Sequence, residues 1–242
     1  ESVQTMMKHP KVRVVVATGG AGVVRAALAS GKKAIAAGPG NPPVIVDDTA
    51  DLAHAARCIV EGAAFDNNMP CIAEKICIPF QSVADDLIRL MTKCGAYLLR
   101  GRELDAVLQL VVKGNEMNRA YIGQDAAKIL RDAGLNPPEG TVLAIFETDR
   151  DHVMVQHEQL MPMLPIVRAR DFDEAVALAV QVEHGFRHTA LIHSKDVDRI
   201  TRFARAIDVT LFVANSHSNA AVGIDGEGYA TMTVAGPTGE GL

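Results

Sequence analysis

Short apolar runs that alternate with helix-forming segments limit this chain to few folds. The first run, residues 11–17, is rich in β-branched valine, which is typical of a strand buried on both faces of a parallel sheet. Further strands are expected at residues 33–37, 44–46, 75–80, 141–146, 164–169, 189–193 and 210–213. Helices are expected at residues 22–30, 51–65 and 82–94, and from residues 103, 124 and 173. Strands separated by helices predict an α/β fold with a layered sheet.

Two of these helices begin with residues that are typical of helix N-termini. Asp171 is followed three positions later by Glu174, and Ser82 is followed three positions later by Asp85. A short polar side chain at the N-cap accepts a hydrogen bond from a backbone N–H group that the helix leaves unpaired. We therefore expect Asp171 to be an N-cap and Ser82 to begin a capping box.

The composition is that of a globular protein, and it argues against two classes of partner. Hydrophobic residues make up 48% of the sequence, charged residues make up 22%, and the formal net charge is −5. A nucleic-acid surface usually needs a basic face, so we expect no nucleic-acid partner. The longest apolar stretches are far too short to span a bilayer, so no membrane partner is expected either.

Both ends of the sequence resemble cut points. The chain begins Glu-Ser-Val-Gln without an apolar leader, and it stops at Gly-Glu-Gly-Leu within a glycine-rich loop. These observations indicate a fragment of a longer protein, and we expect a cytoplasmic location for it.

The four cysteines, Cys58, Cys71, Cys77 and Cys94, show no C-x-x-C spacing. Zinc ribbons need paired close ligands, so no metal is expected, and four free thiols are favoured. Cys71 differs from the other three because it follows a polar turn at residues 66–70 and precedes an expected strand. Catalytic groups favour such loops on rigid scaffolds. A nucleophilic and a buried structural Cys71 both stay open on the residues alone.

A glycine-rich turn, Thr18-Gly-Gly-Ala-Gly22, follows the first strand. Its N–H groups would lie at a helix N-terminus, where they favour a phosphate. The turn does not match G-x-G-x-x-G and lacks an acidic residue about twenty positions on, so a plain tight turn accounts for it as well. A cluster of Gly and Pro at residues 38–43 then indicates a crossing between domains.

The histidines give a weaker signal. His184 and His188 suit an acid/base pair or metal ligands, and a polar surface role suits them as well. His157 precedes Glu158, but no H-E-x-x-H motif follows, which excludes a metalloprotease of that type.

Together these segments resemble the CoA-acylating branch of the aldehyde dehydrogenase superfamily, and especially its microcompartment-associated members. The stretch 65–75 (FDNNMPCIAEK) is similar to the catalytic-cysteine segment of that branch. Further likeness lies in residues 38–43, 183–190, 226–228 and 235–241. The likeness follows essentially the whole chain in order, and the cysteine segment and the C-terminal run are its most specific parts.

The resemblance implies a three-layer, parallel-sheet catalytic domain of the aldehyde dehydrogenase fold at residues 42–242. Residues 1–41 would be the C-terminal remnant of a Rossmann-like nucleotide-binding domain, with most of the cofactor pocket upstream of Glu1. A homo-oligomer is implied for the intact protein, with a microcompartment lumen and shell as its surroundings. On this view the 242 residues by themselves are expected to be inactive.

The resemblance also implies covalent catalysis by Cys71. Its thiolate attacks a short-chain, propanal-like aldehyde, hydride passes to NAD or NADP, and coenzyme A releases the resulting thioester as acyl-CoA. Useful thiolate at neutral pH requires a pKa below the ordinary value of about 8.5. No base adjacent to Cys71 in the sequence supplies this, so the cause must be spatial.

Cofactor-binding residues come from the same resemblance. Thr18, Gly19 and Gly20 match the loop that approaches the dinucleotide pyrophosphate. Glu158 falls where relatives hold the nicotinamide ribose, although Leu160 departs from the Phe that is often found there in hydrolytic members. His188 and Asn68 are expected close behind the nucleophile, and no step is assigned to His188.

Ala37 bears on the fate of the thioester. Hydrolytic members carry a Glu at this place to activate water, whereas alanine cannot take a proton. Loss of a general base typically slows such a step by about 10²–10⁴-fold, so transfer to CoA is favoured over hydrolysis. The alternative is a hydrolytic enzyme whose base is Glu74 or Glu158.

Overall fold

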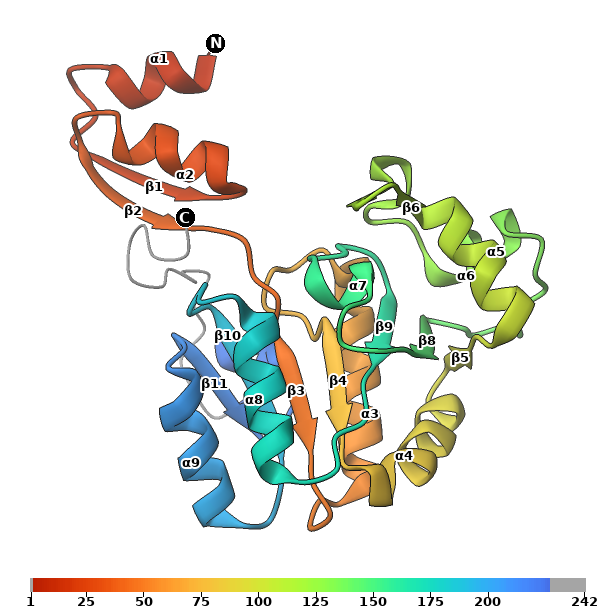
Figure 1. Ribbon diagram of the computed structural model, residues 1–242. Coiled ribbons are helices and arrows are strands. Elements are labelled where there is room, and N and C mark those ends of the chain that lie inside the picture. The colour runs from red at the N-terminus through yellow and green to blue at the C-terminus, as the bar shows by residue number, and fades with distance from the viewer. Residues whose placement is uncertain (1, 227–242) are drawn as a thin grey trace.

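A parallel seven-stranded sheet forms the centre of the chain (Figure 1). The computed structural model describes residues 2–226, so the glycine-rich run at 235–241 and most of that at 226–228 lie outside the described residues. The strands follow the order β11-β10-β3-β4-β9-β8-β5, and all their pairings are parallel. Their bounds are β3 Pro43–Val46, β4 Ile76–Pro79, β5 Ala96–Leu98, β8 Leu143–Glu147, β9 Met163–Ile166, β10 Thr189–His193 and β11 Leu211–Ala214. The predicted α/β fold is thus confirmed.

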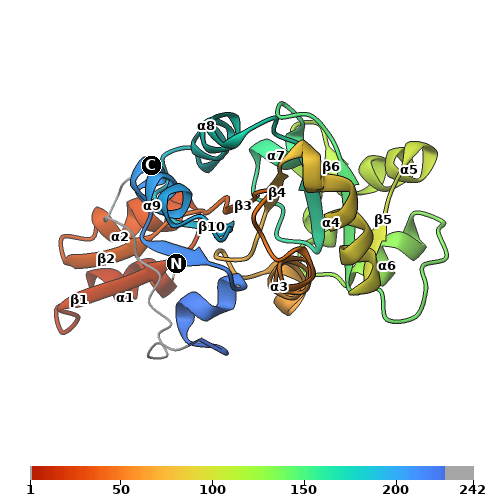
Figure 2. The ribbon, with the colours of Figure 1, turned by 90° about the horizontal axis from the view of Figure 1, so that it is seen from below.

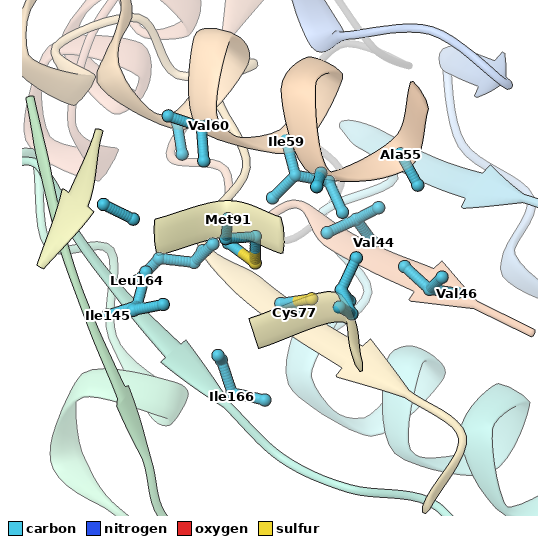
Figure 3. Close-up of a cluster of buried hydrophobic side chains, with 14 of the residues drawn as sticks. Val44, Val46, Ala55, Ile59, Val60, Cys77, Met91, Ile145, Leu164 and Ile166 are labelled. Carbon is cyan, nitrogen blue, oxygen red and sulfur yellow. The ribbon is translucent and has the colours of Figure 1, made fainter. Parts of the chain in front are cut away.

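One face of the sheet is covered by α3 (Leu52–Ala64) and α4 (Gln81–Lys93). Side chains alternate across a strand, so Val44 and Val46 of β3 point to this face. They pack with Cys77, Ile59 and Leu87 in a dry cluster, part of which is drawn in Figure 3. Each fully buried aliphatic side chain of this kind contributes about 1.5–3 kcal/mol to stability, so the layer contact is a main source of the fold's free energy.

The opposite face is covered by α8 (Phe172–Glu183) and α9 (Val197–Ile207). Ile45 of β3 and Ile78 of β4 point to this side and pack with Leu178 and Phe203. In Figure 2, α8 and α3 lie on opposite sides of β3 and β4, which completes three layers.

A smaller cluster extends the molecule beyond β5 and β8 (Figure 1). It contains α5 (Gly101–Val111) and α6 (Ala126–Asp132), and Met154 of α7 (Val153–Gln156), a helix beside β9, packs into it. The short strands β6 (Val112–Lys113) and β7 (Glu116–Met117) pair as an antiparallel hairpin. Turns of 3-10 helix lie at η1 (Phe65–Asn68), η2 (Arg119–Tyr121) and η3 (Ser218–Val222). No helix among residues 2–226 combines the length and the apolar character that crossing a membrane requires.

The first part of the chain forms a separate unit with its own two-stranded sheet (Figure 1). It consists of α1 (Ser2–Lys8), β1 (Val14–Thr18), α2 (Ala21–Leu28) and β2 (Lys33–Ala37). The prediction that β1 is buried on both faces is wrong, because Val14 and Val16 are 46% and 67% exposed. Among the described residues, only the face with Val15 and Ala17 is covered. The domain boundary at residue 41 stays a prediction.

The helix starts agree with the sequence in one case and differ in another. Asp171 accepts a hydrogen bond from the backbone N–H of Glu174, as predicted. The capping box at Ser82 is wrong, because Phe80 occupies the N-cap and α4 already begins at Gln81. Phe80 is almost fully buried, so the packing of its ring sets where the strand turns into the helix.

Gly62 in α3 is required by its neighbour. A methyl group at this position would overlap the carboxylate of the buried Glu74. We expect Gly62→Ala to lower the free energy of unfolding by about 1–3 kcal/mol, as overpacking does. Gly22→Ala in α2 is the matched control, because its methyl group would meet nothing within 4 Å and should add about 0.5–1 kcal/mol. Urea denaturation of both variants checks this, and equal changes in the two would contradict it.

Candidate active site

The candidate site lies at the amino ends of the four central strands. His188 precedes β10, Gly40 precedes β3, Cys71 precedes β4 and Glu158 precedes β9. These strands are neighbours and parallel, so residues that are far apart in the sequence meet along one edge of the sheet. In open α/β sheets ligands more often bind at the carboxyl ends, so this placement is specific to the present fold.

Cys71 differs from the structural cysteines in its exposure. Its side chain is half-buried, whereas Cys58 and Cys77 are buried. Burial raises the pKa of Cys58 to about 11 and that of Cys77 further still, so both thiols stay protonated. Cys94 is also half-buried, but it lies at the end of α4 before the edge strand β5, and not before one of the four strands that carry the site. Cys71 is therefore the accessible thiol of the strand-end site.

A left-handed turn leads into Cys71. Asp66, Asn67 and Asn68 have φ angles of 46°, 54° and 63°, in the region that only Gly, Asn and Asp enter readily. Each such residue stores about 1–3 kcal/mol, which the surroundings must offset. The amide of Asn67 does so by donating to the carbonyl of Gly123 and to the carboxylate of Asp125, at 3.0 and 2.8 Å.

The next residue of the turn, Asn68, is fixed from inside the protein. Its side-chain N–H groups donate to the carbonyl oxygens of Ala63 and Glu74, at 2.8 and 3.1 Å. The Nζ of Lys75 donates to both oxygens of Asn68, the backbone one at 2.8 Å and Oδ1 at 2.6 Å, and to the carbonyl of Pro70 at 3.3 Å. Lys75 is fully buried. A buried cation thus ties down both ends of the segment that precedes Cys71.

His188 lies on the other side of Cys71. A methyl group on Gly40 would come within 2.7 Å of the Cys71 carbonyl oxygen and within 3.0 Å of the His188 ring, so Gly40 fills the narrow space between them. The His188 ring is buried, its Nδ1 lies 2.8 Å from the Thr189 hydroxyl, and its Nε2 has no hydrogen-bond partner among the described residues. Burial, assisted by the charge of Lys75, lowers the pKa of His188 to about 4, so the imidazole is neutral at pH 7.

Glu158 completes the group from the loop before β9. Burial raises its pKa, while Lys75 and the backbone N–H of Gly40 act in the opposite direction. Its Oε1 is buried without a hydrogen-bond partner among residues 2–226. A buried, unpaired carboxylate oxygen fits the hydroxyl groups of a ribose, which are donors. The structure therefore brings Glu158, His188 and Asn68 together around Cys71, and their roles stay predictions.

The pKa of Cys71 is raised by its surroundings. Burial is the largest cause and the charge of Glu158 the next, while Lys75 and the N–H groups of Cys71 and Ile72 lower it. The expectation of a net lowering among the described residues is therefore wrong, because the half-buried sulfur loses hydration and faces a carboxylate.

Glu74 does not face Cys71. Its carboxylate is fully buried and accepts hydrogen bonds from the N–H and hydroxyl groups of Ser218, at 3.0 and 2.8 Å. It also lies against Gly62 of α3. A carboxylate committed to these partners cannot activate a water molecule at Cys71, which leaves Glu158 as the carboxylate for the hydrolytic alternative.

The predicted pyrophosphate loop lies on the small N-terminal unit. Thr18 ends β1, and Gly20 is the N-cap of α2 without a side-chain hydrogen bond to the helix N–H groups. Thr18 and Gly20 are exposed, and a methyl group on Gly20 would meet nothing within 4 Å. Free N–H groups at a helix N-terminus and an open approach fit a phosphate. Gly19 has a φ of 158°, close to extended backbone.

Two other features do not include Cys71. A cavity of about 700 Å³ is lined by residues of α3, η1, α6 and the loop before β8; it includes Asn67 of the turn that precedes Cys71, but not Cys71 itself. Its residues carry none of the titratable groups of the strand-end site, so it does not decide where the chemistry occurs. His184 is exposed at the end of α8 and contacts the carbonyl of Gln156 at 2.9 Å, so a His184–His188 acid/base pair is not formed.

Sequence reasoning missed Lys75 and Gly40. Lys75 directly precedes the apolar strand β4. A lysine beside a continuous apolar run is the signal that could have pointed to it. Gly40 lies inside a cluster of Gly and Pro that predicted a domain crossing and contributed to the family resemblance, but indicated no role at the site. Its close approach to Cys71 and His188 depends on the pairing of distant strands.

Comparison with known proteins shows the family of the chain. Residues 1–230 match the model described as the aldehyde dehydrogenase family. The chain is 46% identical over 242 residues to a propanal dehydrogenase (CoA-propanoylating) from Salmonella typhimurium, covering all of this chain and 52% of that protein. It spans about half the length of the curated relatives it matches.

Two solved structures are similar over almost the whole chain. One is a propionaldehyde dehydrogenase from the Clostridium phytofermentans fucose utilisation bacterial microcompartment, with a TM-score of 0.94, 47% identity, and coverage of 100% of this chain and 56% of that one. The other is a Rhodopseudomonas palustris propionaldehyde dehydrogenase with bound propionyl-CoA, with a TM-score of 0.95, 46% identity, and coverage of 99% and 54%.

Glu74 gives the fold a pH dependence. Burial raises its pKa from 4.5 to about 7, so the folded protein holds this proton more tightly than the unfolded chain. The resulting stabilisation is complete below pH 4.5 and is lost as the pH rises through 7. Relative to Glu74→Gln, we expect the wild type to lose on the order of 3 kcal/mol between pH 5 and 8. Urea denaturation at both pH values checks this, with Glu61→Gln at an exposed position as the control; parallel curves for the wild type and Glu74→Gln would contradict it.

Proposed function

The chain belongs to the aldehyde dehydrogenase family, and on this basis we propose that Cys71 is the nucleophile of an enzyme that oxidises a short-chain aldehyde to an acyl-CoA. The observation that carries the proposal is the position of Cys71, an accessible thiol on a strained, clamped loop beside His188 and Glu158. The activity in the name of the Salmonella relative, and the propionyl-CoA bound in the Rhodopseudomonas structure, support propanal as the aldehyde and CoA as the acyl acceptor.

The first half-reaction forms a covalent intermediate on Cys71. The thiolate attacks the aldehyde carbonyl, and the carbonyl electron pair moves to the oxygen of a thiohemiacetal. Backbone N–H groups of Cys71 and Ile72, which lie close enough to the sulfur to influence its pKa, are suited to stabilise charge that develops there. Nicotinamide, when bound, accepts the hydride, and a thioester remains on Cys71.

The residues that would hold the dinucleotide come from both units of the chain. Glu158 supplies a buried, unpaired oxygen for the ribose hydroxyls. Thr18, Gly19 and Gly20 supply the open loop at the N-terminus of α2 for the pyrophosphate. The proposed cofactor is NAD or NADP.

The second half-reaction transfers the acyl group to coenzyme A. Ala37 provides no base for water, and Glu74 is bound to Ser218. The neutral His188 has a free Nε2 that is suited to accept a hydrogen bond from the CoA thiol as its proton leaves. The thiol brings its own nucleophilic sulfur, so acyl transfer is favoured over hydrolysis.

Hydrolysis is the second candidate, and Glu158 is the observation that favours it. The carboxylate is close enough to raise the pKa of the Cys71 thiol, and its own raised pKa suits a general base. If Glu158 activates water, Glu158→Gln stops the release of free acid while the thioester still forms.

The surroundings of the enzyme are a further part of the proposal. A location of the enzyme in a microcompartment lumen is supported by the Clostridium relative, which comes from a bacterial microcompartment. Assembly into a homo-oligomer and contact with a shell rest on the same likeness. Substrate supply inside a shell would suit a short, volatile aldehyde.

Product analysis of the full-length protein tests the proposed reaction. With propanal, NAD⁺ and CoA we expect propanoyl-CoA as the main product, because the site holds a thioester and disfavours water. Cys71→Ser should lower the rate by at least about a thousandfold, since the nucleophile is lost. Cys58→Ser is the matched control at a buried thiol and should keep the rate. Free propanoate formed at a comparable rate without CoA would contradict acyl transfer.

A further inference from the structure

The side chain of Lys75 is buried where a charge is costly. It is among the largest side chains that are fully removed from solvent, and lysine is almost never fully buried unless it is paired. A leucine or methionine would fill the same space without this cost. A buried charge retained next to a reactive thiol therefore calls for a specific interaction.

The hydrogen bonds of Lys75 show which form it takes. Three oxygen acceptors surround Nζ, namely the two oxygens of Asn68 and the carbonyl of Pro70. An ammonium group has three N–H donors and no acceptor, so it matches this set completely, whereas a neutral amine lacks one donor. Burial lowers the pKa of Lys75 to about 8, which still leaves the group mostly charged at pH 7.

Few charges surround this ammonium. Its charge is stabilised most by Glu158, then by Cys71 and then by Glu74. The same charge lowers the pKa of the His188 imidazole. Glu74 is turned toward Ser218. Two charges therefore act on Cys71. The ammonium of Lys75 favours its thiolate, and the carboxylate of Glu158 disfavours it.

We propose that Lys75 is a positioning residue that holds the turn before Cys71 and, at neutral pH, places a positive charge beside its sulfur. This inference rests on the proposed function in taking Cys71 as the nucleophile. The charge acts in both half-reactions. It favours the thiolate that attacks the aldehyde. When the CoA sulfur bonds to the thioester carbon, the bond from that carbon to Cys71 breaks, and the electron pair returns to the Cys71 sulfur beside the same ammonium.

The pH profile of alkylation measures this charge directly. In the full-length protein, the rate of iodoacetamide addition to Cys71 is followed from pH 6 to pH 10 by peptide mass spectrometry, with Cys94 as the internal reference. In Lys75→Gln, which keeps two N–H donors but no charge, we expect the midpoint to rise by about one pH unit and the rate at pH 7 to fall about tenfold. Lys75→Arg, which keeps the charge, should retain a midpoint close to that of the wild type.

A purely structural role of Lys75 gives a different pattern. It would lower the stability of the variants without moving the midpoint, so an unchanged midpoint in Lys75→Gln overturns the inference. A midpoint in Lys75→Arg that rises as far as in Lys75→Gln overturns it as well. Should Lys75→Gln not unfold cooperatively, Lys75→Met, which also removes the charge, takes its place and must raise the midpoint; no shift there also overturns the inference.

The outcomes separate this inference from the proposed function. If the wild-type protein makes propanoyl-CoA but the midpoint of Cys71 alkylation is the same with and without Lys75, only the role of Lys75 is overturned. A midpoint that follows Lys75 in a protein that makes no acyl-CoA supports the role of the charge and contradicts the function.

Discussion

The ammonium of Lys75 and its three oxygen acceptors are the interaction on which the loop before β4 depends. Three successive residues of that loop adopt left-handed backbone angles, and their combined strain is several kcal/mol. Such a turn persists only if its surroundings fix it. The Lys75 ammonium fixes it through hydrogen bonds to Asn68 and Pro70. The Asn67 amide fixes it through hydrogen bonds to Gly123 and Asp125. Cys71 is thereby presented on a rigid support at the edge of the sheet.

The parallel sheet supplies the other half of the site. Four neighbouring strands begin at one edge, and the segments that enter them carry Gly40, Cys71, Glu158 and His188. The two hydrophobic layers keep the strands in register, so the position of each residue follows from the core. Gly40 then allows the Cys71 loop and the His188 ring to approach more closely than any side chain there would permit. The chemistry is thus built from backbone geometry as much as from functional groups.

The sequence predicted the periodic parts of this arrangement and missed the parts that depend on distant contacts. The strands at residues 33–37 and 189–193 have the predicted bounds, because each contains a short apolar run that follows a glycine-containing turn. The exposure of β1 was not foreseen, since a valine run shows strand character but not whether both faces are covered. The effect of Glu158 on the pKa of Cys71 was not foreseen for a similar reason, because the pairing of β4 with β9 brings the two residues together.

The central claim is that Cys71 carries an acyl group that CoA, and not water, removes. Its most direct test is to mix the full-length protein with propanal and NAD⁺ without CoA, quench it, and locate the modification by peptide mass spectrometry. The account predicts a propanoyl group on the peptide that contains Cys71, stable in buffer and lost when CoA is added. Acylation of another cysteine, or loss of the group in buffer as fast as with CoA, would contradict it.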